Sequence, residues 1–187
     1  MTTSKGTVRI IGGEHRGRKL PFTDQNGDLR PTGDRMRETL FNWLQFQLQD
    51  KRVLDLFAGS GVLAAEALSR GAAHAQLVEK KRERADDLKK VLLPIFAERI
   101  RISCADALKW LDRDTHQYDL VFVDPPYDLG LQQPVCAALQ EYRRVAPGGL
   151  VYVESRRQGA APVVPTNWQC IKEKESGDIR AQLYQVA

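Results

Sequence analysis

Cysteine, histidine and long apolar runs are all scarce in this chain of 187 residues. Its three cysteines lie far apart and form no C-x-x-C pair, so the sequence indicates neither a disulfide framework nor a zinc site. The three histidines are equally scattered, and we therefore expect no metal site. No apolar run is long enough to span a membrane and the first residues contain no signal-peptide core, so we expect a cytoplasmic protein without membrane contact.

Internal repeats and low-complexity linkers are absent as well. The chain is long enough for one good hydrophobic core and leaves little for a second one. Hydrophobic residues make up 42% of the chain and charged residues 28%, which is ordinary for a globular protein. We expect a monomer in which a basic arm, residues 1–30, precedes a single domain, residues 31–187.

Apolar runs alternate with segments of helical periodicity along most of the chain. We expect strands at 52–58, 75–79, 100–105, 119–123 and 149–154, and helices at 61–70, 81–96, 107–111 and 130–144. This alternation predicts an α/β fold with a doubly wound, mostly parallel, Rossmann-like sheet. The segments 169–174 and 180–186 enclose Ser176-Gly177-Asp178 and are typical of a hairpin, which would add an antiparallel strand to the sheet.

All of the net charge lies near the amino terminus. Residues 1–22 contain five basic residues and one acidic residue, and the rest of the chain is balanced. The pieces 7–11 and 18–22 can pair as a short basic hairpin, which would be suited to phosphate. A frayed and solvated terminus is the alternative. The candidate phosphate-binding residues of the arm and of the segment after it are Arg9, Arg16, Arg18, Lys19, Arg30, Arg35 and Arg37.

A helix is expected between the arm and the first strand of the sheet, with Thr32 as its N-cap. Its apolar residues recur at helical spacing on one face. We interpret this face as core packing; it consists of Met36, Leu40, Trp43, Leu44 and Leu48.

The tetrapeptide Asp124-Pro125-Pro126-Tyr127 is the most informative feature of the chain. It follows the apolar run 120–123, which is short, rich in β-branched residues and typical of a strand buried on both faces. The motif then lies at the carboxyl end of that strand, where open α/β sheets bind ligands. Because two prolines fix φ and donate no hydrogen bond, the chain leaves the sheet as a stiff arch that offers acceptors only.

Such an arch suits a planar group that carries an NH2, such as the exocyclic amine of a nucleobase. Asp124 adds acceptors and Tyr127 adds a flat aromatic face. Because charge develops on the amine nitrogen as it attacks, Asp124 would stabilise the transition state more than the ground state. If the ring of Tyr127 stacks on the base, its hydroxyl is dispensable. The alternative is that the motif is only a rigid exit from a strand.

The three preceding strands also end in glycines or acids. The first runs into Gly59 and Gly61, which let the backbone turn tightly at a helix amino terminus. Glu79 ends the second strand twenty positions after Gly59, where a carboxylate can accept hydrogen bonds from both hydroxyls of a ribose. A solvated charge at the head of the next helix is the alternative for Glu79. Asp106 follows the third strand and would meet the amine of an adenine or cap the helix after it.

This order of glycine turn, two acids and D-P-P-Y arch resembles the S-adenosylmethionine-dependent amino-methyltransferases. The stretch 30–44, together with Ile11-Gly12-Gly13 and 16–20, is similar to the bacterial enzymes that methylate N2 of one guanine in 16S ribosomal RNA. One departure is Ala64, near which the pattern has a further glycine. The resemblance implies a Rossmann-like methyltransferase fold, S-adenosylmethionine as the cofactor, and 16S ribosomal RNA in the small ribosomal subunit or an assembly intermediate as the partner.

The resemblance also assigns roles to particular residues. The catalytic set is Asp124, Pro125, Pro126 and Tyr127. The cofactor-binding set is Thr32, Asp55, Phe57, Ala58, Gly59, Gly61, Glu79, Lys80, Asp106 and Ala107. The basic residues of the arm and the following helix would bind RNA.

Two other functions remain open at this point. Methylation of adenine N6 uses the same amine chemistry, although sequence-reading DNA enzymes of this type resemble larger chains with a recognition domain. A ribosome-assembly factor could keep the fold only to bind RNA, but it would be expected to lose Gly59, Glu79 or Asp124, and all three are present. A related protein-glutamine methyltransferase is disfavoured because it would be expected to carry Asn at position 124.

Overall fold

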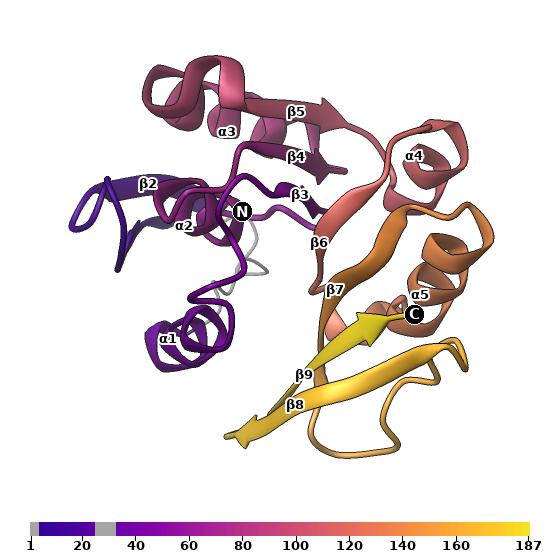
Figure 1. Ribbon diagram of the computed structural model, residues 1–187. Helices are drawn as coiled ribbons and strands as arrows, with labels where there is room; N and C mark the ends of the chain where they lie inside the picture. The colour runs from indigo at the N-terminus through magenta and orange to yellow at the C-terminus, as the bar shows by residue number, and fades with distance from the viewer. Residues whose placement is uncertain (1–3, 25–32) are drawn as a thin grey trace.

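The computed structural model of the protein describes residues 4–24 and 33–187. A seven-stranded sheet of order β5-β4-β3-β6-β7-β9-β8 forms its centre, and a separate hairpin of β1 and β2 lies beside it (Figure 1). The strands are β1 Ser4–Arg9, β2 Lys19–Asp24, β3 Arg52–Asp55, β4 His74–Glu79, β5 Ile100–Cys104, β6 Tyr118–Val123, β7 Val145–Arg156, β8 Trp168–Ser176 and β9 Ile179–Val186. The helices are α1 Asp34–Trp43, α2 Val62–Ser69, α3 Arg82–Phe96, α4 Ala107–Arg113 and α5 Gln132–Glu141.

The sheet is parallel from β5 to β7 and antiparallel at its other end. The pairs β4–β5, β3–β4, β3–β6 and β6–β7 are parallel, whereas β9 pairs antiparallel with both β7 and β8. The predictions of a mostly parallel doubly wound sheet and of a carboxyl-terminal antiparallel hairpin are therefore confirmed. The strand order reverses between β3 and β6, and ligands of open α/β sheets bind at such a point.

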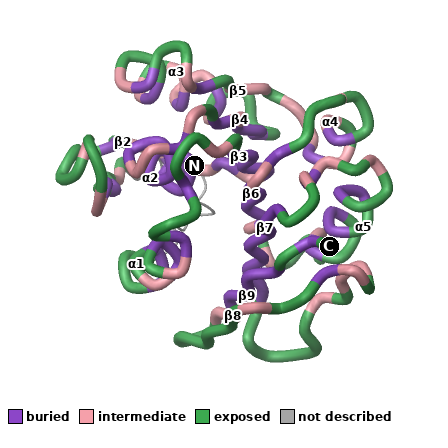
Figure 2. The backbone as a smooth tube through the Cα atoms, in the orientation of Figure 1, coloured by how far each residue is buried: buried purple, intermediate pink, exposed green. Residues whose placement is uncertain are grey.

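Helices cover both faces of the sheet because its central strands are apolar on both sides. Val53 and Phe122 pack in one core together with α1, α2 and α3, whereas Leu54 and Val123 pack in a second core with α4 and α5. Side chains alternate between the two faces of a strand, so consecutive residues belong to different cores. Figure 2 shows the buried segments concentrated along the sheet and the inner sides of the helices.

The amino-terminal hairpin is packed onto this domain. Strands β1 and β2 pair in antiparallel register from Ser4↔Asp24 to Arg9↔Lys19, so the predicted hairpin is present with bounds shifted from the expected 7–11 and 18–22. Ile10 and Leu20 are fully buried in the same core as α1 and α2. The backbone N–H of Ile11 donates to the buried Glu66 of α2 at 2.8 Å. Residues 4–24 are thus a folded part of the molecule, which contradicts the alternative of a frayed terminus for this segment.

Some boundaries differ from the sequence expectation. β3 ends at Asp55 rather than at 58, because the chain turns toward α2 while its apolar residues stay buried. α5 spans only Gln132–Glu141, and β7 begins at Val145 rather than at 149. Arg143 has a φ of +53°, outside the helical range, which separates α5 from β7. The N-cap of α1 is Gly33, and the expected cap Thr32 lies outside the described residues.

Candidate active site

The carboxyl ends of β3, β4, β5 and β6 meet at one edge of the sheet. Asp55 is in register with Leu77 of β4 and Phe122 of β6. Glu79 is in register with Cys104 of β5, two residues before Asp106. The structure therefore brings the four predicted strand ends together.

The turn between β3 and α2 depends on its glycines. Gly59 and Gly61 both have positive φ, 53° and 73°, a conformation that side chains disfavour. A Cβ on Gly61 would also lie 2.7 Å from methyl carbons of Leu88 and Leu92 on α3. Gly61 is the N-cap of α2, so the glycine turn leads directly into the amino terminus of this helix.

α2 packs closely although it lacks the further glycine that the pattern has near Ala64. All eight residues of the helix are buried, and Ala64 is completely so. Small side chains allow this approach, since four of the eight residues are alanine or serine.

Glu79 links the glycine turn to the end of β4. One oxygen accepts from the backbone N–H of Gly59 at 3.1 Å, and the other accepts from the N–H of Lys81 at 2.8 Å. Glu79 is buried, so the alternative of a solvated charge is wrong. A carboxylate has about four acceptor positions, and these two bonds leave room for further donors such as ribose hydroxyls.

Asp55 is a second buried acid beside Glu79. Its pKa is raised from the ordinary 3.8 to about 7: burial is the main cause and the nearby Glu79 charge adds to it, whereas hydrogen bonds from the backbone of Phe57 and Ala64 partly offset the rise. The bond from Phe57 N–H measures 3.4 Å. A buried carboxyl with such a pKa at a strand end is a candidate for ligand binding.

Asp106 is the N-cap of α4, which confirms one of the two roles left open by the sequence. Its Oδ1 accepts from the backbone N–H of Lys109 at 3.4 Å, and its Oδ2 lies 3.1 Å from the Lys80 ammonium. The hydrogen bond from Lys80 is the main reason why the pKa of Asp106 is lowered. Capping does not exclude the second role, since Asp106 remains partly exposed at the site edge.

The D-P-P-Y arch leaves β6 as expected and then forms a short 3₁₀ helix, Tyr127–Leu129. Pro126 has φ −51° and ψ 125°, close to the polyproline conformation. Its carbonyl accepts from the N–H of Leu129 at 3.1 Å, so this acceptor is used within the arch. Asp124 lies at the end of β6, half-buried, directly before the prolines.

The Tyr127 hydroxyl donates to Oε1 of Glu154 at 2.6 Å. Burial is the main reason why the pKa of this hydroxyl is raised, and the Glu154 charge raises it further, so it stays protonated and can donate. Sequence reasoning treated the hydroxyl as dispensable and missed Glu154. The sequence did contain a signal for Glu154, since it is a carboxylate within the mostly apolar segment 150–155. A carboxylate buried in such a strand needs hydrogen-bond partners.

The basic residues proposed for RNA divide into two groups. Arg9, Arg16, Arg18 and Lys19 are exposed and make no ion pair with the described residues, and Arg35 is exposed on α1, so each of these five presents a basic side chain at the surface. Arg37 does not, because it is fully buried and donates to the Arg9 carbonyl at 2.9 Å and to Asp34. Arg37 therefore joins the arm to α1 and has no surface for phosphate. Arg30 lies outside the described residues.

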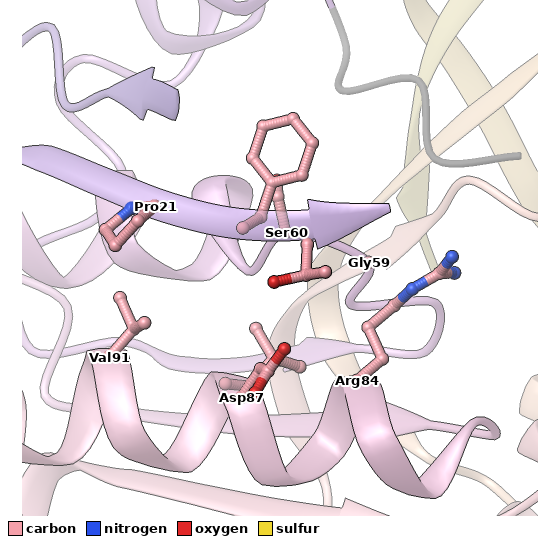
Figure 3. Close-up of a pocket in the computed structure, with 9 residues that line it drawn as sticks. Pro21, Gly59, Ser60, Arg84, Asp87 and Val91 are labelled. Atoms are coloured by element: carbon pink, nitrogen blue, oxygen red, sulfur yellow. The ribbon is translucent and has the colours of Figure 1, made fainter. Parts of the chain in front are cut away.

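A narrow cleft lies between β2, the glycine turn and α3. Figure 3 shows Ser60 between the strand that carries Pro21 and the helix that carries Asp87. The cleft is lined by Pro21, Phe22 and Thr23 of β2, by Gly59 and Ser60 of the turn, and by Arg84, Asp87, Leu88 and Val91 of α3. We interpret it as the seam between the arm and the domain, which Arg84 and Asp24 also bridge at 3.9 Å.

Residues 4–24 and 33–187 contain no group of three or more metal-ligating side chains that could hold a metal ion. No helix in this described part of the chain is both long and apolar enough to cross a membrane.

Comparison with known proteins places the chain in a family. The family described as Conserved hypothetical protein 95 matches residues 8–185. Ribosomal RNA small subunit methyltransferase D of Escherichia coli K12 is 44% identical over 183 residues, which cover 98% of this chain and 92% of that protein. The protein of the same name from Haemophilus influenzae is 43% identical over 97% of this chain and 95% of its own length.

A solved structure, that of yhhF from Escherichia coli, has the same fold. It superposes with a TM-score of 0.87 at 44% identity, covering 97% of this chain and 98% of that one. The chain therefore belongs to the Conserved hypothetical protein 95 family and to the family of the ribosomal RNA small subunit methyltransferase D proteins.

Proposed function

We propose that the protein transfers a methyl group from S-adenosylmethionine to the N2 amine of one guanine in 16S ribosomal RNA. The observation that carries the proposal is the D-P-P-Y arch at the carboxyl end of β6, beside the glycine turn and acids of β3 to β5. Close relatives over nearly the whole chain are named small subunit ribosomal RNA methyltransferases, which supports this substrate. The small subunit or an assembly intermediate is the proposed form of the substrate.

The residues at the strand ends suit a nucleoside cofactor. Glu79 keeps free acceptor positions for ribose hydroxyls, and Asp106 offers an acceptor at the site edge for an adenine amine. The positive φ values of Gly59 and Gly61 permit a close approach of the backbone. Further residues proposed to line the cofactor are Thr32, Asp55, Phe57, Ala58, Lys80 and Ala107.

Bound S-adenosylmethionine supplies an electrophilic methyl group on a sulfonium. The protein's task is to hold the guanine amine so that its nitrogen lone pair faces that methyl. Asp124 accepts an N–H bond of the amine, favours its pyramidal form and stabilises the positive charge that develops on nitrogen. Transfer would break the methyl carbon–sulfur bond as the carbon–nitrogen bond forms, would leave S-adenosylhomocysteine, and would let the methylated amine release one proton to solvent.

In this proposal the amino-terminal arm and Tyr127 bind the RNA. The exposed basic residues Arg9, Arg16, Arg18 and Lys19 bind phosphates, and Arg35 extends this surface. A stacked or paired guanine hides its amine, so the target base is turned out into the site. The ring of Tyr127 stacks on that base while Asp124 holds the amine.

Methyl transfer from labelled cofactor to purified nucleic acids tests this function. We expect incorporation into small ribosomal subunits or their 16S RNA, recovered after digestion as N2-methylguanosine. Large subunits and duplex DNA serve as controls, and Asp124→Ala should abolish the signal. Label in N6-methyladenosine would favour the adenine alternative, and no label in any substrate would favour a non-catalytic assembly factor.

A further inference from the structure

A buried cluster of two tyrosines and one carboxylate joins the arch to β7. Oε1 of Glu154 accepts from Tyr127 at 2.6 Å, and Oε2 accepts from Tyr152 at 2.8 Å. Glu154 is only 2% exposed, and Tyr152 is fully buried. Both carboxylate oxygens are thus satisfied by hydroxyl donors, one from the arch and one from the sheet.

The register of the sheet places this cluster directly beside the reacting motif. Val123 of β6 is in register with Val153 of β7, so the next residues along the two parallel strands are Asp124 and Glu154. The two carboxylates therefore lie on neighbouring strands at the same level. In the proposed function Asp124 holds the target amine, and Glu154 accepts from the tyrosine three positions further along the arch.

Two more contacts tie the same end of β7 to the segment after the prolines. Arg156 donates to Asp128 at 2.5 Å, one residue after Tyr127. The side-chain amide of Gln132 donates to the Glu154 carbonyl at 3.2 Å. The arch is therefore held by β7 at its tyrosine, at the residue after it and at the start of α5.

A carboxylate at this position is costly for folding. Desolvation by burial raises the pKa of Glu154, and the hydrogen bonds from Tyr127 and Tyr152 only partly offset this effect. An uncharged residue of the same shape could be buried at this position with a smaller desolvation cost. Stability alone therefore does not account for an acid in the middle of this strand.

We propose that Glu154 is a positioning residue that fixes the ring of Tyr127 for the target base. The inference rests on the proposed function, because the ring is useful in this orientation only if a planar base enters beside Asp124. Tyr127 is half-buried, and without the hydroxyl bond its ring would be fixed only by packing. Both oxygens of Glu154 accept from tyrosine hydroxyls, whereas the side-chain amide of a glutamine has only one acceptor oxygen.

The consequence is that the Tyr127 hydroxyl is needed although it does not touch the base. A small misplacement of a group that orients the substrate can cost on the order of a hundredfold in rate. We therefore expect Tyr127→Phe and Glu154→Gln to have similar kinetic defects. Neither change touches the ends of β3, β4 and β5, so binding of S-adenosylmethionine should keep its normal affinity and stoichiometry.

The test compares Glu154→Gln, Tyr127→Phe and Tyr152→Phe on small ribosomal subunits. Tyr152→Phe is the matched control, because it removes a hydroxyl from the same carboxylate and leaves the bond to the arch intact. We expect kcat to fall by roughly tenfold to a hundredfold in the first two variants, with little change in the KM for the subunit. Tyr152→Phe should keep a kcat near that of the wild type even if its melting temperature falls.

The double variant Glu154→Gln/Tyr127→Phe sharpens the test. If the two residues act through one bond, it should be no slower than either single variant. Equal losses in Tyr127→Phe and Tyr152→Phe, or a normal kcat in Glu154→Gln with one cofactor bound per chain, would overturn the positioning role. A wild-type protein that methylates no guanine N2 would instead overturn the proposed function, so the two failures are distinguishable.

Discussion

The ends of β3, β4 and β5 and the arch after β6 form two halves of one site, and they are held by different kinds of contact. In the first half, Glu79 bonds to backbone N–H groups of Gly59 and Lys81, and Asp106 caps its own helix. In the second half, Tyr127 bonds to the Glu154 side chain across 27 positions of sequence. The first, which is the proposed cofactor half, is thus tied largely through the backbone, and the second, which is the proposed base half, is tied through side chains of a neighbouring strand.

This difference suggests how each half tolerates change. Acceptors that bond to backbone are set by strand register and helix starts, which many sequences can provide. A bond between two side chains depends on both residues, so a single substitution breaks it. We therefore expect changes in the cofactor half to appear as weaker binding and changes in the base half to appear as slower turnover.

The largest effect is expected for Asp124→Ala. Removing the acceptor that stabilises the charged amine should lower kcat by on the order of a hundredfold or more, with much of the cofactor affinity retained. Single-turnover methylation and calorimetric titration of S-adenosylmethionine measure the two quantities. Asp124→Asn, which keeps one acceptor oxygen without charge, should be intermediate. A near-normal rate for the alanine variant would refute the division of the site into two halves.

Asp55→Asn should change how stability depends on pH. The pKa of Asp55 is raised to about 7, so the folded protein binds more protons than the unfolded chain between about pH 4 and 7. The contribution of Asp55 to the free energy of unfolding is therefore at its full value below about pH 4 and is lost as the pH rises through about 7.

We compare the free energy of unfolding of Asp55→Asn with that of the wild type at pH 5 and at pH 8.5. The difference should shift in favour of Asp55→Asn by on the order of a few kcal/mol from the lower pH to the higher one. Urea unfolding of both proteins without ligand at the two pH values measures this difference. A constant difference would mean that the carboxyl titrates normally.

Glu79→Ala should weaken the binding of S-adenosylmethionine. Unpaired ribose hydroxyls and a loosened Gly59 turn should together reduce the binding free energy by about 1 to 3 kcal/mol. The kcat at saturating cofactor should change much less, because the arch is untouched. Calorimetry that finds an unchanged affinity would remove Glu79 from the cofactor half.

The smallest effect is expected for single changes in the arm. Arg18→Ala should weaken RNA binding and lower the slope of its salt dependence by about one unit, without affecting cofactor binding. Arg37→Ala is a useful contrast, because this buried residue should lower the melting temperature rather than the salt slope. Equal salt slopes for Arg18→Ala and the wild type would exclude Arg18 from the phosphate contacts.

The sequence alone determined much of the architecture, including the glycine turn and the acids at the strand ends. Periodicity and the alternation of elements gave the order of strands and helices, since both are local properties of the chain. Gly59, Gly61 and Glu79 could be recognised because a turn at a helix start and an acid at the next strand end have a fixed spacing. The D-P-P-Y motif was recognisable for the same reason, since its stiffness is a property of consecutive residues.

Only the tertiary structure decided which residues distant in the sequence contact one another. Arg37 looked like part of a basic surface, but the docking of the arm on α1 buries it beneath the Arg9 carbonyl. The role of the Tyr127 hydroxyl depends on Glu154, which register places beside the arch. Local pattern fixes backbone conformation, whereas burial and partners between distant residues depend on how the strands align, and that alignment is decided by packing of the whole core.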